Sequence, residues 1–425
     1  MKKIYFSVIT ACIVLLIPSL QAFAQINVEG DFRMRWYSDS FGWARDNRAQ
    51  ENYLRYLGRL RAKAKVTSNT SFTTELITLI DSPGQPIRNI AGTGPMRFGV
   101  SQIYAEMSEQ NVLFFDLARI RLGRQQFPIG NGLSFGDSYY YTDKFDGGRL
   151  DLAYFPITLS LFGAITGQNL SASGLYPDPG SDQIYAAKLS GNFFEQDLMI
   201  YGIEQKLRGP YNDNIVYGAG ATGEIYFKDL EYFVEGAYQQ FNQPPGLPEK
   251  GGIGYMGGLG YRWGLGPFRS IKVETRYAAY EGDDAKTTKI EQFSPPYPNF
   301  FWGGRAGYVN GEVGGDYPRN SQNLEGSRIW YTRMYVIPKM FPKIRFQMQY
   351  VKVNEYVDND NYNSMDDEFS VRLYYTVTNN SAFQIRFARA IPNGDDKDKD
   401  GGGLITSSED RVSINSYMLE WQIEF

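Results

Sequence analysis

The sequence predicts an all-β protein, namely a transmembrane, antiparallel, up-and-down β-barrel of about 18 strands. Three observations support this fold class: an amphipathic last strand, a secretory N-terminus, and alternating segments joined by short and long connections in turn. Aromatic residues make up 16% of the chain, which fits a membrane protein because Tyr and Trp favour membrane–water interfaces. A mean hydropathy of −0.40 is compatible with a barrel, in which only alternate residues face lipid.

The last nine residues, 417–425, predict a strand with one apolar and one polar face. Apart from Met418, apolar and polar side chains alternate, and the apolar set is Tyr417, Leu419, Trp421, Ile423 and Phe425. Successive side chains of a strand point to opposite faces, which produces this pattern. A terminal aromatic on such a strand resembles the closing strand of Gram-negative outer-membrane barrels. The resemblance implies the barrel assembly machinery as a partner.

Residues 1–24 predict a secretory signal peptide, which leaves residues 25–425 as the barrel domain. Two lysines precede an apolar run, and the small residues of Ala22-Phe23-Ala24 form a cleavage site. A lipoprotein box ending at Cys12 is the alternative, although the apolar run continues past that residue. Because Cys12 is the single cysteine of the sequence, cleavage at the predicted site excludes disulfides and thiol chemistry.

The remainder of the chain is a single meander without a domain boundary. Short turns rich in Gly, Pro, Asn and Asp alternate with longer polar stretches. Counting the segments between them predicts about 18 strands, eight short turns and nine long loops, with 16 strands as the alternative. This asymmetry is typical of outer-membrane barrels. It places both termini in the periplasm and the long loops outside the cell.

Basic and apolar side chains alternate in several segments, and this alternation predicts the lumen side of each strand. A charge that faces lipid near the membrane centre costs about 2–4 kcal/mol, so the basic faces are expected to point inward. Guanidinium groups in a confined, low-dielectric pore favour anions. The alternative is that these cations pair with inward Glu residues and brace the wall. The residues predicted to line the pore and bind solute are Arg33, Arg35, Arg55, Arg59, Arg61, Lys63, Arg119, Arg121, Arg124, Arg345 and Arg386.

Two stretches resemble the alginate-export family of outer-membrane barrels. Residues 122–132 contain Gly123-Arg124-Gln125 followed by a Gly-rich loop, and residues 143–150 contain Asp-Lys-Phe-Asp-Gly-Gly. The Arg-rich opening at residues 30–36 is also similar. The resemblance implies an 18-stranded, Arg-lined pore that passes polyuronate, with that role carried by Arg33, Arg35, Arg59, Arg61, Arg121 and Arg124. The alginate exporter has a long plugging turn late in its chain, whereas the late turns here are short. A broader carbohydrate or carboxylate porin is therefore expected.

One long loop has the spacing of a calcium site. Asp396, Asp398 and Asp400 precede Gly401, and hard oxygen ligands at alternate positions can wrap one ion. Ser407 stands where a closing bidentate acid is expected, so a solvated acidic loop is the alternative. No other cofactor is predicted. The acidic loops are also expected to hold divalent cations that bridge to lipopolysaccharide phosphates, which makes outer-membrane lipid and lipopolysaccharide predicted partners.

Loop 281–325 is the longest connection and is rich in Pro, Gly and aromatic residues. Long loops of this kind are commonly functional. Two interpretations stay open: the loop folds inward and narrows the pore, or it remains a surface loop that binds a partner.

The sequence therefore predicts a passive porin for acidic oligosaccharides or small carboxylates, with no nucleic-acid partner. A non-conducting adhesin or assembly partner, acting through its long outer loops, is the alternative. No enzyme is expected, because barrel hydrolases and acyltransferases typically use Ser and His, and the chain has no His.

Overall fold

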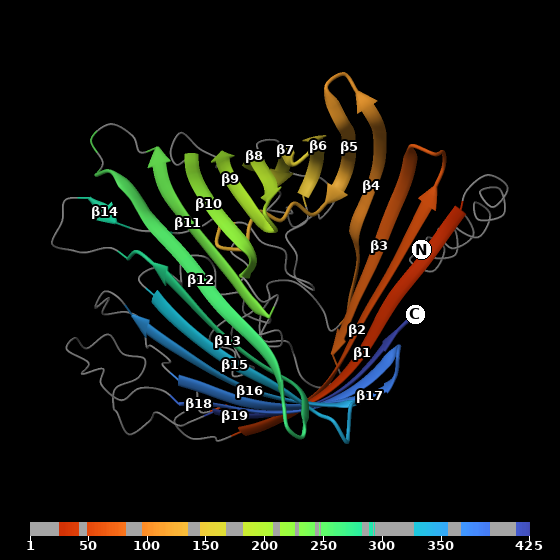
Figure 1. Ribbon diagram of the computed structural model, residues 1–425, viewed down its shortest axis with the longest axis vertical. Helices are drawn as coiled ribbons and strands as arrows, with labels where there is room; N and C mark the ends of the chain where they lie inside the picture. Colours follow the sequence, from red (N-terminus) through yellow and green to blue (C-terminus); the bar gives the residue numbers. More distant parts are fainter. Residues whose placement is uncertain are drawn as a thin grey trace, which may run out of the picture.

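The computed structural model describes residues 25–425 except 42–48, 82–95, 135–144, 167–181, 207–212, 226–228, 243–245, 247, 283–288, 292, 294–326, 356–366 and 392–413. The described part is a single closed β-barrel (Figure 1). None of its residues belongs to a helix long and apolar enough to cross a membrane. The predicted signal peptide, residues 1–24, lies outside the described residues.

The first half of the wall contains β1 (Gln25–Phe41), β2 (Ala49–Lys65), β3 (Thr70–Asp81), β4 (Met96–Val112), β5 (Phe115–Gln125), β6 (Phe145–Tyr154), β7 (Ile157–Thr166), β8 (Asp182–Phe193), β9 (Gln196–Lys206) and β10 (Asp213–Ile225). The second half contains β11 (Leu230–Asn242), β12 (Lys250–Leu265), β13 (Phe268–Tyr280), β15 (Ser327–Pro338), β16 (Ile344–Glu355), β17 (Asp367–Thr378), β18 (Ser381–Ile391) and β19 (Ile414–Glu424). The two-residue β14 (Ile290–Glu291) adds a short parallel pairing to the start of β12.

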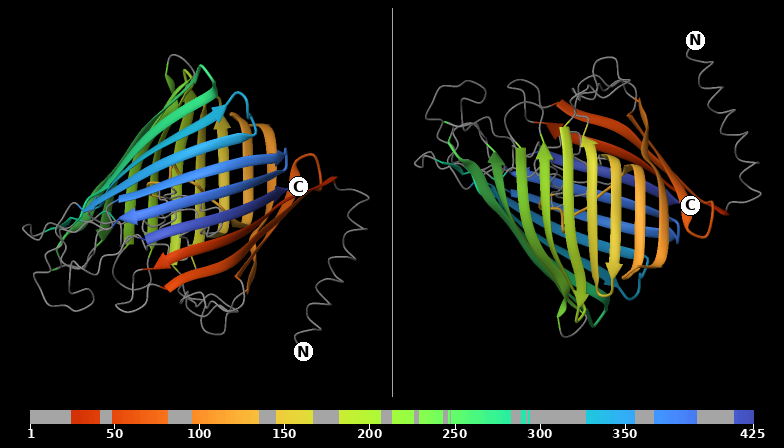
Figure 2. Two further views of the ribbon diagram at one scale, coloured as in Figure 1. Left: turned by 90° about the horizontal axis from the view of Figure 1, so that it is seen from below. Right: turned by 90° about the horizontal axis from the view of Figure 1, so that it is seen from above.

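Apart from β14, each strand runs antiparallel to both neighbours, which gives the predicted wall of 18 strands. Eight short turns join the strands at one end, and nine longer connections join them at the other, as predicted. By the convention of bacterial outer-membrane barrels, the end with the short turns is called periplasmic. Figure 2 shows the tilted strands from two sides.

Side chains alternate between the two faces of the wall, and the apolar set points outward. Leu122, Ile200 and Tyr217 are each more than half exposed on the outer surface. Inward positions of the same wall hold buried polar residues such as Arg35 and Glu75. This distribution is the reverse of a water-soluble protein, and it is what a wall surrounded by hydrocarbon requires.

The first and last strands close the barrel. β1 and β19 pair in register from Asp31 opposite Glu424 to Asp39 opposite Ser416. The Phe425 N–H donates to the Gly30 carbonyl at 2.9 Å, and the Gly30 N–H donates to the Phe425 carbonyl at 2.7 Å. On the outer face Trp421 stacks on Phe383 of β18, with ring centroids 6.0 Å apart. The predicted amphipathic strand is confirmed.

Gly30 allows the terminal ring to lie against this seam. A Cβ at Gly30 would lie 2.7 Å from Cζ of Phe425 and 2.8 Å from the Arg59 backbone carbonyl, which cannot rotate away. At Gly236 of β11, by contrast, an added Cβ would meet nothing within 4 Å.

Gly30→Val is therefore expected to destabilise the folded barrel by about 1–3 kcal/mol, the usual cost of overpacking. The measurement is the temperature at which the folded, faster-migrating band disappears in electrophoresis. Gly236→Val is the matched control and should leave this temperature unchanged. Equal behaviour of the two variants would mean that the seam tolerates the added side chain.

Candidate functional site

The barrel lumen has two unlike sides. The basic arc is formed by the inward cations of β13 to β18 and, across the seam, of β1 to β6. Its members are Lys272, Arg276, Arg333, Arg345, Arg372, Arg386, Arg33, Arg35, Arg59, Arg61, Lys63, Arg119, Arg121 and Arg149. The apolar wall is the inner surface of β7 to β12, with Phe162, Ile184, Ala186, Tyr201, Ile203, Val216, Ala237 and Met256.

Many cations of the basic arc pair with carboxylates on the same strand or on a neighbouring strand. Arg35 forms a buried salt bridge with Glu420 across the seam. The other close pairs are Arg59 with Asp31 at 2.8 Å, Arg61 with Glu75 at 2.5 Å, Arg121 with Glu106 at 2.5 Å and Arg149 with Asp151 at 2.8 Å. Arg33 lies 3.6 Å from Asp31. Wall-bracing pairs, the alternative raised by the sequence, are therefore present.

Three other cations of the basic arc form no salt bridge in the described part of the chain. Lys63 and Arg119 lie near Glu106 and interact with its charge, but not within salt-bridge distance. Arg345 lies over two aromatic rings instead, 4.1 Å from the Tyr374 centroid and 5.5 Å from that of Tyr335. The basic arc thus contains cations beyond those in its salt bridges.

The expectation that Arg124 lines the lumen is not met. Arg119 and Arg121 of β5 point inward, Gly123 occupies the next inward position, and Arg124 follows on the outer face. There it is half exposed and pairs with Asp146 of β6 at 2.7 Å. The carboxylate partner makes an outward guanidinium tolerable at the extracellular end of the wall.

Several predicted features cannot be placed in the site. Arg55 lies in β2 opposite Asp81, but its side chain is outside the described part. Asp396, Asp398 and Asp400 are outside it as well, as is most of loop 281–325. Among the described residues no group of three or more His, Cys, Asp or Glu could hold a metal ion.

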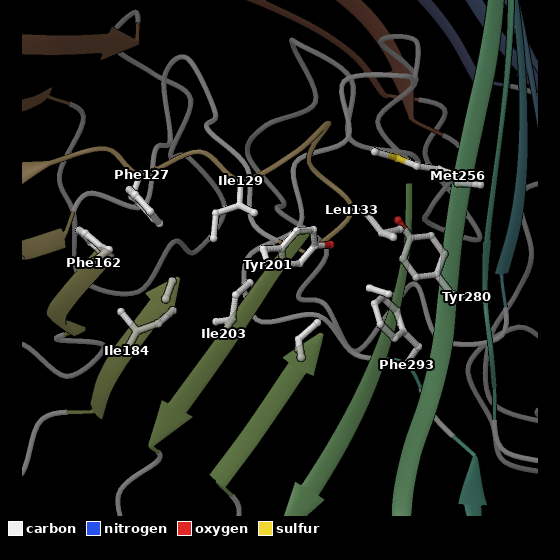
Figure 3. Close-up of a cluster of buried hydrophobic side chains, with 14 of the residues drawn as sticks. Phe127, Ile129, Leu133, Phe162, Ile184, Tyr201, Ile203, Met256, Tyr280 and Phe293 are labelled. Atoms are coloured by element: carbon white, nitrogen blue, oxygen red, sulfur yellow. The ribbon is translucent and has the colours of Figure 1, made fainter. Parts of the chain in front are cut away.

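The segment after β5 folds into the lumen (Figure 3). This inward segment, residues 126–134, was expected to be part of an outer loop, yet Phe127, Ile129 and Leu133 are buried against the apolar wall. Phe127 stacks on Phe162 with ring centroids 4.4 Å apart. The sequence contained a signal, because apolar residues recur through an otherwise polar connection.

Glu235 of β11 anchors the inward segment from the apolar wall. Its buried carboxylate accepts hydrogen bonds from the Asn131 backbone N–H at 2.6 Å and from the Tyr201 hydroxyl at 2.8 Å. Ser134 reaches the same Tyr201 hydroxyl at 3.0 Å. A Cβ at Gly130, where φ is +67°, would lie 2.6 Å from the Glu235 carboxylate oxygens. Glycine therefore permits both the turn and the close approach to the carboxylate.

The fold matches solved outer-membrane porin structures. The chain is similar to Pseudomonas aeruginosa OccK11 (OpdR), with a TM-score of 0.56 and 11% identity over 94% of this chain and 96% of that one. It is also similar to OprD of the same organism, with a TM-score of 0.51 and 14% identity over 94% and 95%. The P. aeruginosa outer membrane protein opdK matches with a TM-score of 0.55 and 11% identity over 94% and 98%.

No protein-family model and no curated protein matches the sequence. At these identities the likeness shows the fold, which is that of barrels in the Gram-negative outer membrane. The predicted fold class is confirmed.

Removing the Glu235 carboxylate should loosen the inward segment. Glu235→Ala leaves the Asn131 N–H and the Tyr201 hydroxyl without this acceptor, at a cost of about 1–3 kcal/mol per unsatisfied group. The expected result is a noisier and larger single-channel current in planar bilayers.

The matched control for this experiment is Glu231→Ala. Glu231 lies on the same inward face of β11 but bonds to Lys272 at 2.6 Å. Its removal should leave the current noise as in the parent protein. An unchanged Glu235→Ala trace would show that packing alone holds the segment.

Proposed function

We propose that this chain is an outer-membrane porin, a passive diffusion channel that prefers anionic solutes. The closed barrel fold and its likeness to outer-membrane porins support the channel. No chemical step is required of the protein, because fixed charge and pore width suffice for selectivity.

The observation that carries the anion preference is the set of cations in the basic arc that form no salt bridge. Lys63, Arg119 and Arg345 form none in the described lumen, although Arg121 and Arg61 nearby do, and Lys63 and Arg119 share the Glu106 charge with Arg121. Charge in a pore with low-dielectric walls acts over a longer range than in bulk water, so it raises the local concentration of anions. The salt bridges fix the orientation of the paired arginine side chains. The cations without a salt bridge contribute the positive electrostatic potential of the lumen.

The solutes proposed are acidic oligosaccharides or small carboxylates. Arginine binds a carboxylate in bidentate fashion, and aromatic rings offer flat surfaces to sugar rings. Both kinds of group alternate along the arc: Arg121 lies 4.4 Å from the Tyr104 ring centroid, and Arg333 lies between Tyr331 and Tyr335. The resemblance to the alginate-export family at residues 122–132 is consistent with a uronate as one such solute.

The partners proposed with this function are outer-membrane lipid, lipopolysaccharide and the barrel assembly machinery. The terminal aromatic strand supports recognition by the assembly machinery. The acidic outer loops support cation bridges to lipopolysaccharide, and calcium is the ion proposed for Asp396, Asp398 and Asp400.

Neutralising cations that form no salt bridge should weaken anion selectivity. In Lys63→Gln/Arg119→Gln the reversal potential under a salt gradient is expected to move toward zero. Removing one charge roughly 7 Å from an ion changes the energy of that ion by about 0.6 kcal/mol in a water-like dielectric, which is about threefold. Because two charges are removed and they act on anions and cations with opposite sign, the ratio of anion to cation permeability should fall about tenfold or more.

Arg124→Gln is the control for this measurement, because it removes a cation from the outer face rather than from the lumen. It should keep the parent reversal potential. A channel that is already cation-selective before substitution contradicts the proposal. A protein that inserts and stays silent favours the alternative, an adhesin or assembly partner that acts through its outer loops.

A further inference from the structure

A cavity of about 480 Å³ lies between the inward segment and the periplasmic ends of β7 to β10. Pro128, Gly130 and Asn131 of the segment form one side of it. Lys188, Ser190 and other inward residues of the barrel wall form the opposite side. Its volume is within the roughly 300–1,000 Å³ of pockets that bind small molecules. The cavity lies on the other side of the lumen from most of the basic arc.

Strand register brings the polar lining together. Thr158 of β7 stands opposite Ser190 of β8, and Lys188 follows two residues away on the same inward face. On the next strands Asp197 stands opposite both Asn192 and Thr222. Directly opposed residues of an antiparallel pair have Cβ atoms about 5 Å apart, so these groups form one continuous patch.

The donors of this patch are not used by the protein itself. Within the described chain neither the Lys188 ammonium nor the hydroxyls of Ser190 and Thr222 form a hydrogen bond or salt bridge. Arg149, two strands away, differs in this respect because it pairs with Asp151. Asn192 also has an internal partner, since its amide donates to Asp197 at 2.8 Å.

Glycines of β10 allow two inward side chains of β9 to lie across them. Gly218 stands opposite Tyr201 and Gly220 stands opposite Met199, both on inward positions. A Cβ at either glycine would collide with the tyrosine ring or the methionine methyl group that lies across it. The Met199 methyl group also approaches the inward segment, because a Cβ at Gly130 would lie 2.6 Å from it, and Met199 forms part of the cavity lining.

We propose that this cavity binds a sugar-sized hydroxycarboxylate carrying a single negative charge, such as an aldonate or uronate monosaccharide. Lys188 would hold the carboxylate, and the hydroxyls of Thr158, Ser190 and Thr222 would bind the hydroxyl groups of the solute. Asp197 adds an acceptor for hydroxyl hydrogens at the far end. The inference rests on the proposed function and adds to it a defined binding site on the wall opposite the arc.

The charge pattern selects this class over its neighbours. A neutral sugar would bring no anion to the Lys188 ammonium, whose charge interacts with both Arg149 and Asp151 but forms no salt bridge in the described chain. A dianion such as a phosphate monoester would carry two negative charges into a cavity lined by one cation, Lys188, and one carboxylate, Asp197. The Asp197 carboxylate would repel the second negative charge. An acyclic or cyclic monosaccharide acid satisfies the lysine and the hydroxyl groups together.

Isothermal titration of gluconate into the purified, detergent-solubilised full chain tests the site without depending on conduction. The parent protein should bind gluconate and give no comparable signal with glucose. Lys188→Gln should weaken gluconate binding about tenfold or more, the change expected from about 1.4 kcal/mol of lost charge-assisted bonding. Lys188→Arg keeps the positive charge and should retain most of the gluconate affinity. This result would show that position 188 tolerates substitution, so that the loss in Lys188→Gln is due to the charge.

Lys206→Gln is the matched control, since it removes an exposed lysine from the outer face of β9, away from the lumen, and should leave the gluconate affinity within about twofold of the parent. Equal affinity for glucose and gluconate, or an unchanged affinity in Lys188→Gln, overturns the site while leaving anion selectivity intact. If the parent channel is cation-selective but still binds gluconate through Lys188, the proposed anion-selective function is wrong. The proposed binding site is then still supported.

Discussion

The structure depends on one constraint: every backbone N–H and C=O inside the hydrocarbon must bond to another backbone group. A sheet with free edges cannot meet this condition, so the first and last strands must find each other. The seam of β1 and β19 does this over nine residue pairs, ending at the paired backbone groups of Gly30 and Phe425. All lumen chemistry depends on that closure, because it sets which residues face inward and which strands become neighbours.

Closure also determines how charge is arranged. Because the outside must be apolar, ionic side chains gather inside, where they are close to one another and partly shielded from water. Neighbouring strands place carboxylates beside many guanidinium groups, and Arg35 with Glu420 is a pair that exists only because the seam exists. Pairs across strands stabilise the wall. Cations that form no salt bridge in the described chain, such as Lys63, add to the positive potential that acts on solutes in the lumen.

The inward segment divides the lumen. Apolar residues in an outer connection cannot remain in water at low cost, and here Phe127, Ile129 and Leu133 bury themselves on the wall opposite the basic arc. The backbone N–H groups that are buried with these side chains need hydrogen-bond acceptors, and the Glu235 carboxylate accepts the bond from the Asn131 N–H. The same folding leaves space between the segment and the periplasmic ends of β7 to β10. The inward position of the segment and the cavity beneath it therefore both result from the burial of these apolar side chains.

The sequence by itself determined the strand pattern. The period-two alternation, the turn residues and the terminal aromatic depend on local geometry. The 18 strands, the closing strand predicted at 417–425 and observed at 414–424, and the alternation of short and long connections could therefore be predicted from it. The same alternation identified Arg33, Arg35, Arg59, Arg61, Lys63, Arg119 and Arg121 as inward residues.

Only the tertiary structure decided which side chains meet. Pairs such as Arg121 with Glu106 depend on strand register, and no local pattern specifies register between strands. The prediction that Arg124 faces the lumen was wrong, because Gly123 occupies the inward position and the alternation puts Arg124 on the outer face. The apolar residues of segment 126–134 are a signal in the sequence, but they do not decide which outer connection folds into the lumen, because that also depends on whether a distant strand offers a complementary surface. Glu235 lies more than a hundred residues from Asn131, and only the closed barrel brings that carboxylate to the segment it holds.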